Sequence, residues 1–360
     1  MSALLVLEDG RTFRGTAVGA AGQAFGEVVF HTGMTGYEEI ATDPSYRGQI
    51  VAFTTPHIGN YGVNGEDAQA DRPALSGIVV REMSAEAGNW RATGTFGDWL
   101  ADRGVVGISG VDTRALTRHL RARGAMRGGI FSEPPAGFDP IERVLAHPPL
   151  DGRDLTVEVT TPAPYVVPPV GKARHRVVAL DFGVKRGILA AMAARGAEVE
   201  VLPASAPADA VLGRRPDGVL LSNGPGDPAA VTNGIDTVRE LVGRVPILGI
   251  CLGHQLLGLA LDARTFKLRF GHHGGNHPVK DIRTEEVWIT AQNHCFAVDP
   301  ATLPRDEIEI AQVSLYDGTL EGFASKRRRF LAVQYHPEGC PGPNDAAGVF
   351  DRFASMMEQS

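Results

Sequence analysis

The stretch G-I-C-L-G-H-Q, residues 249–255, decides the fold of the second half of the chain. It follows an apolar run at 245–248, and the leucines that come after it predict a buried helix. A strand, a sharp turn and a helix in this order form a nucleophile elbow, which holds the side chain at its apex, here Cys251, out of the turn. A lone cysteine is more often a buried structural side chain, so the rest of the sequence must decide between the two interpretations.

Length and composition restrict the class of protein. A chain of 360 residues exceeds the size of one hydrophobic core, which predicts two domains. The net charge of −7 argues against a nucleic-acid partner, and no apolar run is long enough to span a membrane. Three cysteines do not form a disulfide framework, and residues 1–9 lack the features of a secretory signal. We therefore expect a cytoplasmic protein.

The pattern of the chain changes in the middle. Residues 151–175 contain four prolines and no helical period, which predicts a stiff, extended linker. Residues 1–150 predict a mixed α/β domain without regular alternation, including a helix over 112–123 with Asp112 as its cap. Residues 176–360 predict an α/β domain in which an open, mostly parallel sheet is flanked by helices.

Strands and helices alternate after the proline-rich stretch. Strands are expected at 177–180, 199–202, 219–221 and up to Cys251, with helices at 187–195, 207–214 and 231–242. In a parallel sheet of this kind, ligands bind beyond the carboxyl ends of the strands. The turn at Cys251 and the glycine-rich turn 222–228 both follow strands, so we expect the site at this edge of the sheet.

A cysteine nucleophile needs a base, and the base needs a group that orients it. The segment Q-Y-H-P-E, residues 334–338, supplies both after the apolar strand 330–333. His336 is the candidate base, and Glu338 could accept a hydrogen bond from its imidazole. The N-terminus of the helix after Cys251 would favour the thiolate, and the Leu252 N–H is placed to donate to an oxyanion.

These residues resemble those of a known family. G-I-C-L-G-H-Q followed about 85 residues later by H-P-E resembles the class I (triad-type) glutamine amidotransferases. The resemblance implies that Cys251 is the nucleophile, His336 the general acid/base and Glu338 the orienting carboxylate. Further motifs, across both halves of the chain, resemble the small subunit of carbamoyl phosphate synthases: residues 4–10, 34–40, 42–46, 56–60, 181–186, 222–228, 270–279, 291–294 and 341–347.

The resemblance also implies a substrate, a partner and a set of binding residues. Ammonia from glutamine would pass through a tunnel to a separate large subunit in a heterodimer or a higher oligomer. ATP, Mg²⁺ and bicarbonate are expected on that subunit, because this chain has no phosphate-cradling motif and we expect no cofactor in it. The residues implied to hold glutamine are Ser45, Gly224, Gly226, Leu252, Gln255, Asn293, Cys295 and Phe296.

One position departs from the family pattern, because Cys295 stands where A-Q-N-H-G-F has glycine. A residue that needed a positive φ there would cost on the order of 1 kcal/mol, and its side chain could narrow the pocket. Oxidation could also join Cys251 to Cys295 or Cys340, although most such thiols are inert. The alternatives are therefore a binding or regulatory subunit with impaired glutaminase, another class I amidotransferase subunit, or a γ-glutamyl hydrolase.

Three histidines, His272, His273 and His277, lie close together in the sequence. Their spacing fits no common ligand set for zinc, which favours four ligands in a closed site. We expect a loop packed against the active-site domain there, and no metal. The basic run 326–329 is read as a solvated turn, which could contact an acidic partner.

Overall fold

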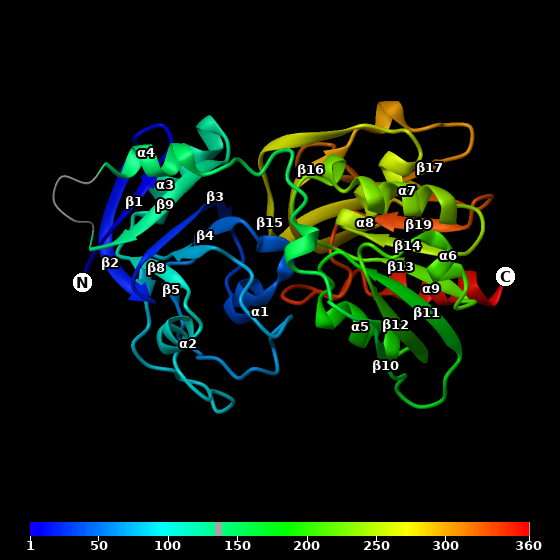
Figure 1. Cartoon of the computed structure of the whole chain (residues 1–360), viewed down its shortest axis with the longest axis horizontal. Helices are drawn as coiled ribbons and strands as arrows, with labels where there is room; N and C mark the ends of the chain where they lie inside the picture. The colour runs from blue at the N-terminus through cyan, green and yellow to red at the C-terminus, as the bar shows by residue number, and fades with distance from the viewer. Residues whose placement is uncertain (134–138, 360) are drawn as a thin grey trace. The chain divides into compact units, whose positions relative to one another are not determined.

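The computed structural model describes residues 1–133 and 139–359 of the chain (Figure 1). The chain divides into two compact units. The first unit contains residues 1–151 and 269–274, and the second contains residues 152–268 and 275–360. No sequence pattern predicts that residues 269–274 belong with the first unit.

A closed barrel is the main feature of the first unit. Its strands follow the order β1-β2-β8-β6-β4-β3-β9 around the barrel. The strands are β1 (Ser2–Leu7), β2 (Thr12–Gly19), β3 (Gln23–His31), β4 (Gln49–Phe53), β6 (Gly77–Val79), β8 (Val106–Ser109) and β9 (Met126–Ser132). Two short strands, β5 (His57–Ile58) and β7 (Glu82–Met83), pair with each other. Fully buried side chains such as Leu5, Val28 and Ile50 form the core of this unit.

Short helices complete the first unit. They are α1 (Tyr37–Thr42), the 3₁₀ helix η1 (Pro44–Tyr46), α2 (Phe96–Asp102), α3 (Thr113–Arg123) and α4 (Pro140–Ala146). The predicted cap of α3 is confirmed, because Asp112 Oδ1 accepts a hydrogen bond of 2.9 Å from the Ala115 N–H. The sequence predicted mixed α/β structure here, but not a barrel.

A ten-stranded sheet forms the centre of the second unit, in the order β10-β12-β11-β13-β14-β19-β18-β17-β15-β16. The first half of its strands are β10 (Tyr165–Val167), β11 (His175–Asp181), β12 (Ala197–Pro203), β13 (Gly218–Leu221) and β14 (Ile247–Ile250). The rest are β15 (Thr265–Asp281), β16 (Val287–Val298), β17 (Glu309–Ser314), β18 (Leu320–Ser325) and β19 (Phe330–Val333). The α/β class is confirmed, but only β12, β11, β13, β14 and β19 pair in parallel.

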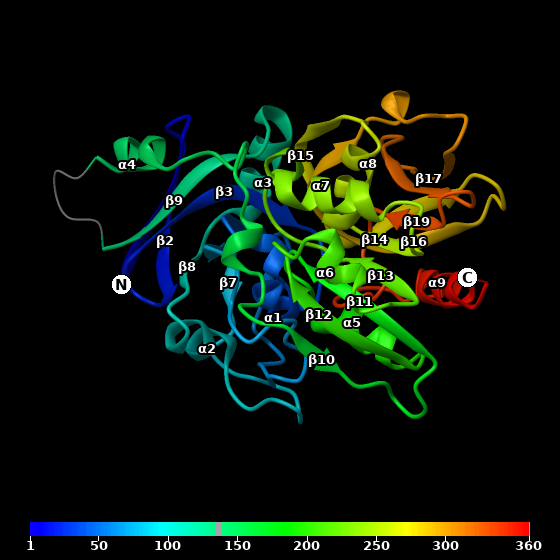
Figure 2. The ribbon, with the colours of Figure 1, turned by 45° about the vertical axis from the view of Figure 1, so that its right-hand side comes forward.

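Helices cover both faces of this sheet, as the alternating pattern predicts. They are α5 (Arg186–Ala193), α6 (Ala208–Leu212), α7 (Thr232–Leu241), α8 (Leu252–Ala260) and α9 (Gly348–Glu358), with 3₁₀ helices η2 (Thr156–Glu158), η3 (Pro228–Ala230) and η4 (Pro300–Thr302). Figures 1 and 2 show α7 and α8 on one side of β13 and β14, and α5 and α9 on the other. Each face has its own buried apolar cluster. The parallel strands are therefore covered on both sides, as their continuous apolar runs require.

The proline-rich stretch 151–175 is more than a linker. It contains η2 and the edge strand β10, whose Val166 pairs with Glu200 of β12 in antiparallel register. Apart from its first residue it clusters with the second unit. In the part of the chain that the structure describes, no helix combines the length and the apolar character that crossing a membrane requires.

Candidate active site

The turn at Cys251 has the backbone of a nucleophile elbow. Strand β14 ends at Ile250 and helix α8 begins at Leu252, so Cys251 alone forms the turn. Its backbone has φ 53° and ψ −103°, and this strained geometry costs on the order of 1–3 kcal/mol. The Cys251 N–H donates to the Val333 carbonyl at 2.9 Å, and the Cys251 carbonyl accepts from the Gln255 N–H at 3.2 Å. Both ends of the strained residue are thus fixed by hydrogen bonds.

Close backbone packing explains the two glycines that flank this cysteine. A Cβ on Gly253 would lie 2.2 Å from the Leu221 carbonyl oxygen, and one on Gly249 would lie 2.8 Å from the Gly253 carbonyl oxygen. Helix α8 therefore starts directly against β13 and β14, with no room for side chains. The sequence correctly predicts the tight turn, and the crowding comes from the chain's own backbone.

His336 and Glu338 follow β19, the strand that pairs in parallel with β14. The His336 N–H donates to the Ala291 carbonyl at 2.9 Å, which fixes the backbone of the histidine against β16. Its Nδ1 lies 2.8 Å from Oε1 of Glu338. Since an ionised carboxylate can only accept, Nδ1 carries the proton and Nε2 faces away from the carboxylate. This is the predicted geometry for a base and the group that orients it.

A lysine completes this cluster, and the sequence analysis assigned it no role. Lys185 Nζ lies 2.7 Å from Oε1 of Glu338, and the side chains of both residues are almost fully buried. The Lys185 N–H also donates to the Asn223 side-chain oxygen at 3.2 Å, which ties this residue to the turn 222–228. Lysine is almost never fully buried unless it is paired. The one available signal was the lysine in D-F-G-V-K-R, directly after the end of a predicted strand.

The charges of the cluster shift two pKa values in opposite directions. Burial alone would lower the pKa of His336, but the neighbouring Glu338 carboxylate outweighs it and raises the pKa to about 10, while Lys185 opposes that effect. Burial would raise the pKa of Glu338, but Lys185 and His336 hold it well below its usual range. At neutral pH the site therefore contains an imidazolium, a carboxylate and an ammonium ion.

The thiol of Cys251 lies at the edge of this cluster. Its Sγ donates to the Asn293 carbonyl oxygen, at a distance of 3.6 Å. Among the described residues, Nε2 of His336 has no partner at hydrogen-bonding geometry, but hydrogen bonding with the Cys251 side chain contributes to the raised pKa of the ring. Catalytic hydrogen bonds are often long before substrate binds, so a small rotation of the thiol suffices to engage the base.

The turn 222–228 lies beside the start of α8. The Gly253 N–H donates to the Ser222 carbonyl at 3.0 Å, and a Cβ on Gly224 would meet both the Phe182 carbonyl oxygen at 2.2 Å and the Leu252 side chain at 2.8 Å. The structure thus brings Gly224 and Leu252 together next to Cys251. Because Leu252 is the first residue of α8, its N–H has no acceptor within the helix and is open to an oxyanion.

Gly226 has a conformation that favours glycine, with φ +92°. A Cβ there would lie 2.6 Å from the Arg153 carbonyl oxygen, and Asp154 forms an isolated bridge with this glycine. The segment that follows residue 151 therefore packs onto the turn and shapes this part of the site.

Comparison with known proteins identifies both parts of the chain. Residues 5–130 match the model of the carbamoyl-phosphate synthase small chain, CPSase domain, and residues 178–356 match that of the class I glutamine amidotransferases. A carbamoyl phosphate synthase small chain of Syntrophotalea carbinolica is 48% identical over 100% of this chain and 99% of the relative. The chain belongs to the carbamoyl phosphate synthase small-chain family. Small chains of Streptomyces coelicolor and Thermus thermophilus are 50% and 48% identical, each over 99% of this chain and over 96% and 93% of the relative.

The small-chain family resemblance and the fold class predicted from the sequence are thus confirmed. An amidotransferase subunit of another kind, or a γ-glutamyl hydrolase, would leave the matched region 5–130 unexplained. The roles of individual residues remain predictions, because the comparisons do not test them.

Four of the residues expected to hold glutamine lie on α8 and β16. The Gln255 side chain donates from Nε2 to the Phe296 carbonyl at 2.8 Å and to Oε1 of Gln334 at 3.1 Å, so its amide nitrogen is used within the protein. Asn293 presents its carbonyl to the thiol, as described above. Cys295 is buried, and its φ is not positive, so the strain expected at this position is not present. The expected narrowing of the pocket remains a prediction.

Ser45 and two of the three histidines belong to the first unit. Ser45 lies in η1, where its N–H donates to Oδ1 of Asp43 at 2.9 Å, and its expected contact with glutamine stays a prediction. The His273 carbonyl accepts a hydrogen bond from the Thr32 N–H at 3.1 Å, within the same unit. His277, in the second unit, packs edge-on against Tyr316.

Proposed function

We propose that this chain is the glutamine-hydrolysing subunit of a carbamoyl phosphate synthase. The reaction converts glutamine and water into glutamate and ammonia. The observation that carries the proposal is the arrangement of Cys251 at a strained elbow beside His336, whose imidazole is held by Glu338. Family membership over both units supports the same reaction.

In the first half of the reaction, the Cys251 thiolate attacks the side-chain carbonyl carbon of glutamine. The Leu252 N–H, with the partial positive charge of the α8 N-terminus, stabilises the oxyanion that forms. The C–N bond then breaks, and the His336 imidazolium gives its Nε2 proton to the departing nitrogen, which leaves as ammonia. The product is a γ-glutamyl thioester on Cys251.

In the second half, His336 accepts a proton from water, and the resulting hydroxide attacks the thioester carbonyl. The C–S bond breaks, glutamate leaves and the thiolate returns. Glu338 keeps the imidazole in the tautomer and orientation that both steps need, as the carboxylate of a catalytic triad does. Lys185 holds that carboxylate in its charged form, since its ammonium lowers the pKa of Glu338.

The ammonia would pass through an internal tunnel to the large subunit, because ammonia released into water is protonated or lost. That subunit would bind ATP, Mg²⁺ and bicarbonate and form carbamoyl phosphate, which serves arginine and pyrimidine biosynthesis in the cytoplasm. Small chains of this family imply such a partner by their name. The assembly would be a heterodimer or a higher oligomer of heterodimers.

The test is glutamate release from glutamine by the purified chain, alone and with the large subunit. Cys251→Ser should lower turnover by at least about a hundredfold, because a serine hydroxyl is a poor nucleophile without the thiolate's low pKa. The matched control is Cys340→Ser, which makes the same atomic change at a half-buried thiol outside the triad. Turnover that survives in Cys251→Ser would refute the assigned nucleophile.

The alternative of a binding or regulatory subunit depends on Cys295. If wild-type chain plus large subunit shows no turnover while Cys295→Gly does, this cysteine has impaired the pocket and the alternative is correct. If mild oxidant inactivates the wild type and Cys295→Gly equally, a disulfide between Cys251 and Cys295 is excluded.

A further inference from the structure

A buried carboxylate outside the triad connects the segments that carry the site. Glu321 lies on β18 and is fully buried. Its Oε2 accepts a hydrogen bond of 2.8 Å from Nε2 of Gln292 on β16. Hydrogen bonds to an ionised acceptor are shorter and stronger than neutral ones, so this contact holds β16 firmly.

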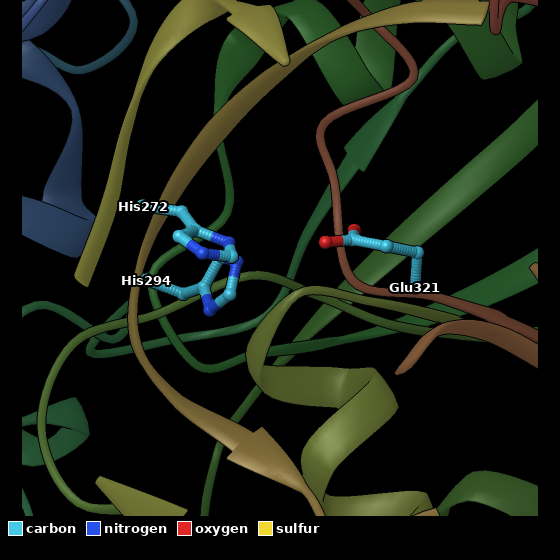
Figure 3. Close-up of side chains that lie close together, drawn as sticks. All are labelled: His272, His294 and Glu321. Carbon is cyan, nitrogen blue, oxygen red and sulfur yellow. The ribbon is translucent and has the colours of Figure 1, made fainter. Parts of the chain in front are cut away.

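The same carboxylate faces a second side chain of β16. Figure 3 shows His294 and Glu321 directed toward each other, and a ring nitrogen of the first lies within 4.8 Å of a carboxylate oxygen of the second. The other ring nitrogen contact of His294 is Nδ1 to the Phe296 carbonyl, at 2.8 Å. Since side chains two apart on a strand lie on the same face, Gln292 and His294 together present one face of β16 to Glu321.

The opposite face of β16 belongs to the proposed glutamine pocket. Asn293 and Cys295 alternate with the two residues that face Glu321, and the Asn293 carbonyl contacts the Cys251 thiol. Holding Gln292 and His294 therefore fixes the rotation of the strand about its own axis. That rotation decides where Asn293 and Cys295 point.

The backbone of Glu321 is connected to the base as well. Its carbonyl accepts a hydrogen bond of 2.8 Å from the N–H of Gln334, two residues before His336. The Gln334 side chain in turn accepts from Gln255 on α8, which also donates to the Phe296 carbonyl on β16. A continuous buried polar network thus joins α8, β16 and the segment of the base.

We propose that Glu321 is a positioning residue for glutamine binding, which acts by setting the orientation of β16. This role rests on the proposed glutamine hydrolysis. Glu321 itself need not touch glutamine or the reacting atoms. Its loss should therefore weaken glutamine binding much more than it changes the reactivity of Cys251, because the contacts of His336 with Glu338 and Lys185 do not pass through the Glu321 side chain.

The experiment compares Glu321→Ala and Glu321→Gln with the wild type, in the presence of the large subunit. We expect Glu321→Ala to raise KM for glutamine at least tenfold and to change the rate of Cys251 alkylation by iodoacetamide less than threefold. Glu321→Gln keeps an oxygen that can accept from Gln292, so it should restore KM to within about threefold of the wild type. The control for general destabilisation is Val238→Ala, a buried truncation on α7 that should leave KM unchanged.

Three results would overturn the role of Glu321 alone: an unchanged KM in Glu321→Ala, an equal rise in Val238→Ala, or failure of Glu321→Gln to restore KM. Should Glu321→Ala fail to fold, Gln292→Ala removes the same hydrogen bond from the other side and carries the same expectations. Absence of turnover by the wild-type chain with its large subunit would instead overturn the proposed function, and this role with it.

Discussion

The ion pair between Lys185 and Glu338 allows a quantitative test of the cluster, since its atoms lie 2.7 Å apart and both side chains are excluded from solvent. The perturbation is a double-mutant cycle made of Glu338→Gln, Lys185→Met and the double variant. Each substitution keeps the approximate length of the side chain, so packing changes little. The cycle therefore isolates the electrostatic coupling between the two residues.

The structure predicts unequal costs for the two single variants. Glu338→Gln leaves the Lys185 ammonium buried opposite a neutral amide, and breaking a buried pair in this way costs about 3–5 kcal/mol of unfolding free energy. Lys185→Met is expected to cost less, about 1.5–3 kcal/mol, because Glu338 keeps its hydrogen bond to His336. The double variant buries no unpaired charge at this pair, so it should be more stable than the sum of the single costs by about 2 kcal/mol.

The measurement is urea unfolding at pH 7 of a chain in which Trp90 and Trp99, both in the first unit, are replaced by Phe. The remaining tryptophan, Trp288, then reports on the second unit alone, which contains the cluster. Additive costs, with a coupling below about 0.5 kcal/mol, would refute the buried ion pair. A larger loss in Lys185→Met than in Glu338→Gln would refute the central position of the carboxylate.

Two further predictions concern the same unit. Because the folded-state pKa of His336 is raised to about 10, its contribution to stability is fully present below about pH 6.5 and is lost as pH rises through about 10; the urea midpoint of the second unit should fall over that window in wild type, and His336→Asn, if it folds, should abolish that part of the fall. Gly253→Ala should prevent normal folding of the second unit, because its Cβ would lie 2.2 Å from the Leu221 carbonyl oxygen. Its control, Gly348→Ala, meets no atom within 4 Å and should leave the midpoint unchanged; equal midpoints for the two variants would contradict the crowding at α8.

Local patterns predicted the catalytic half of the molecule well. The apolar runs before Cys251 and before His336 became β14 and β19, and the glycines of G-I-C-L-G became the tight start of α8. These features follow from short stretches of chain, in which periodicity and glycine placement determine the backbone. The same holds for the cap of α3 at Asp112.

The features that the sequence did not predict depend on contacts between distant segments. Closure of seven strands into a barrel, and the insertion of residues 269–274 into the first unit, require pairings that no local pattern encodes. The antiparallel half of the second sheet has the same origin, because β15 to β18 are joined without the helices that parallel pairing needs. Lys185 was missed because its burial depends on Glu338, which lies far along the chain.

The catalytic geometry follows from the register of two strands. In the parallel pair of β14 and β19, Ile250 lies opposite Val333, and the next N–H along, that of Cys251, donates to the Val333 carbonyl. Three residues then separate Val333 from His336, whose own N–H is held by Ala291. A slip of one residue in this pairing would turn the side chains of β19 to the opposite faces of the sheet and move His336 away from the thiol. The buried apolar faces of β14 and β19 therefore set the distance between nucleophile and base, so packing of the core and assembly of the site are one requirement on the sequence.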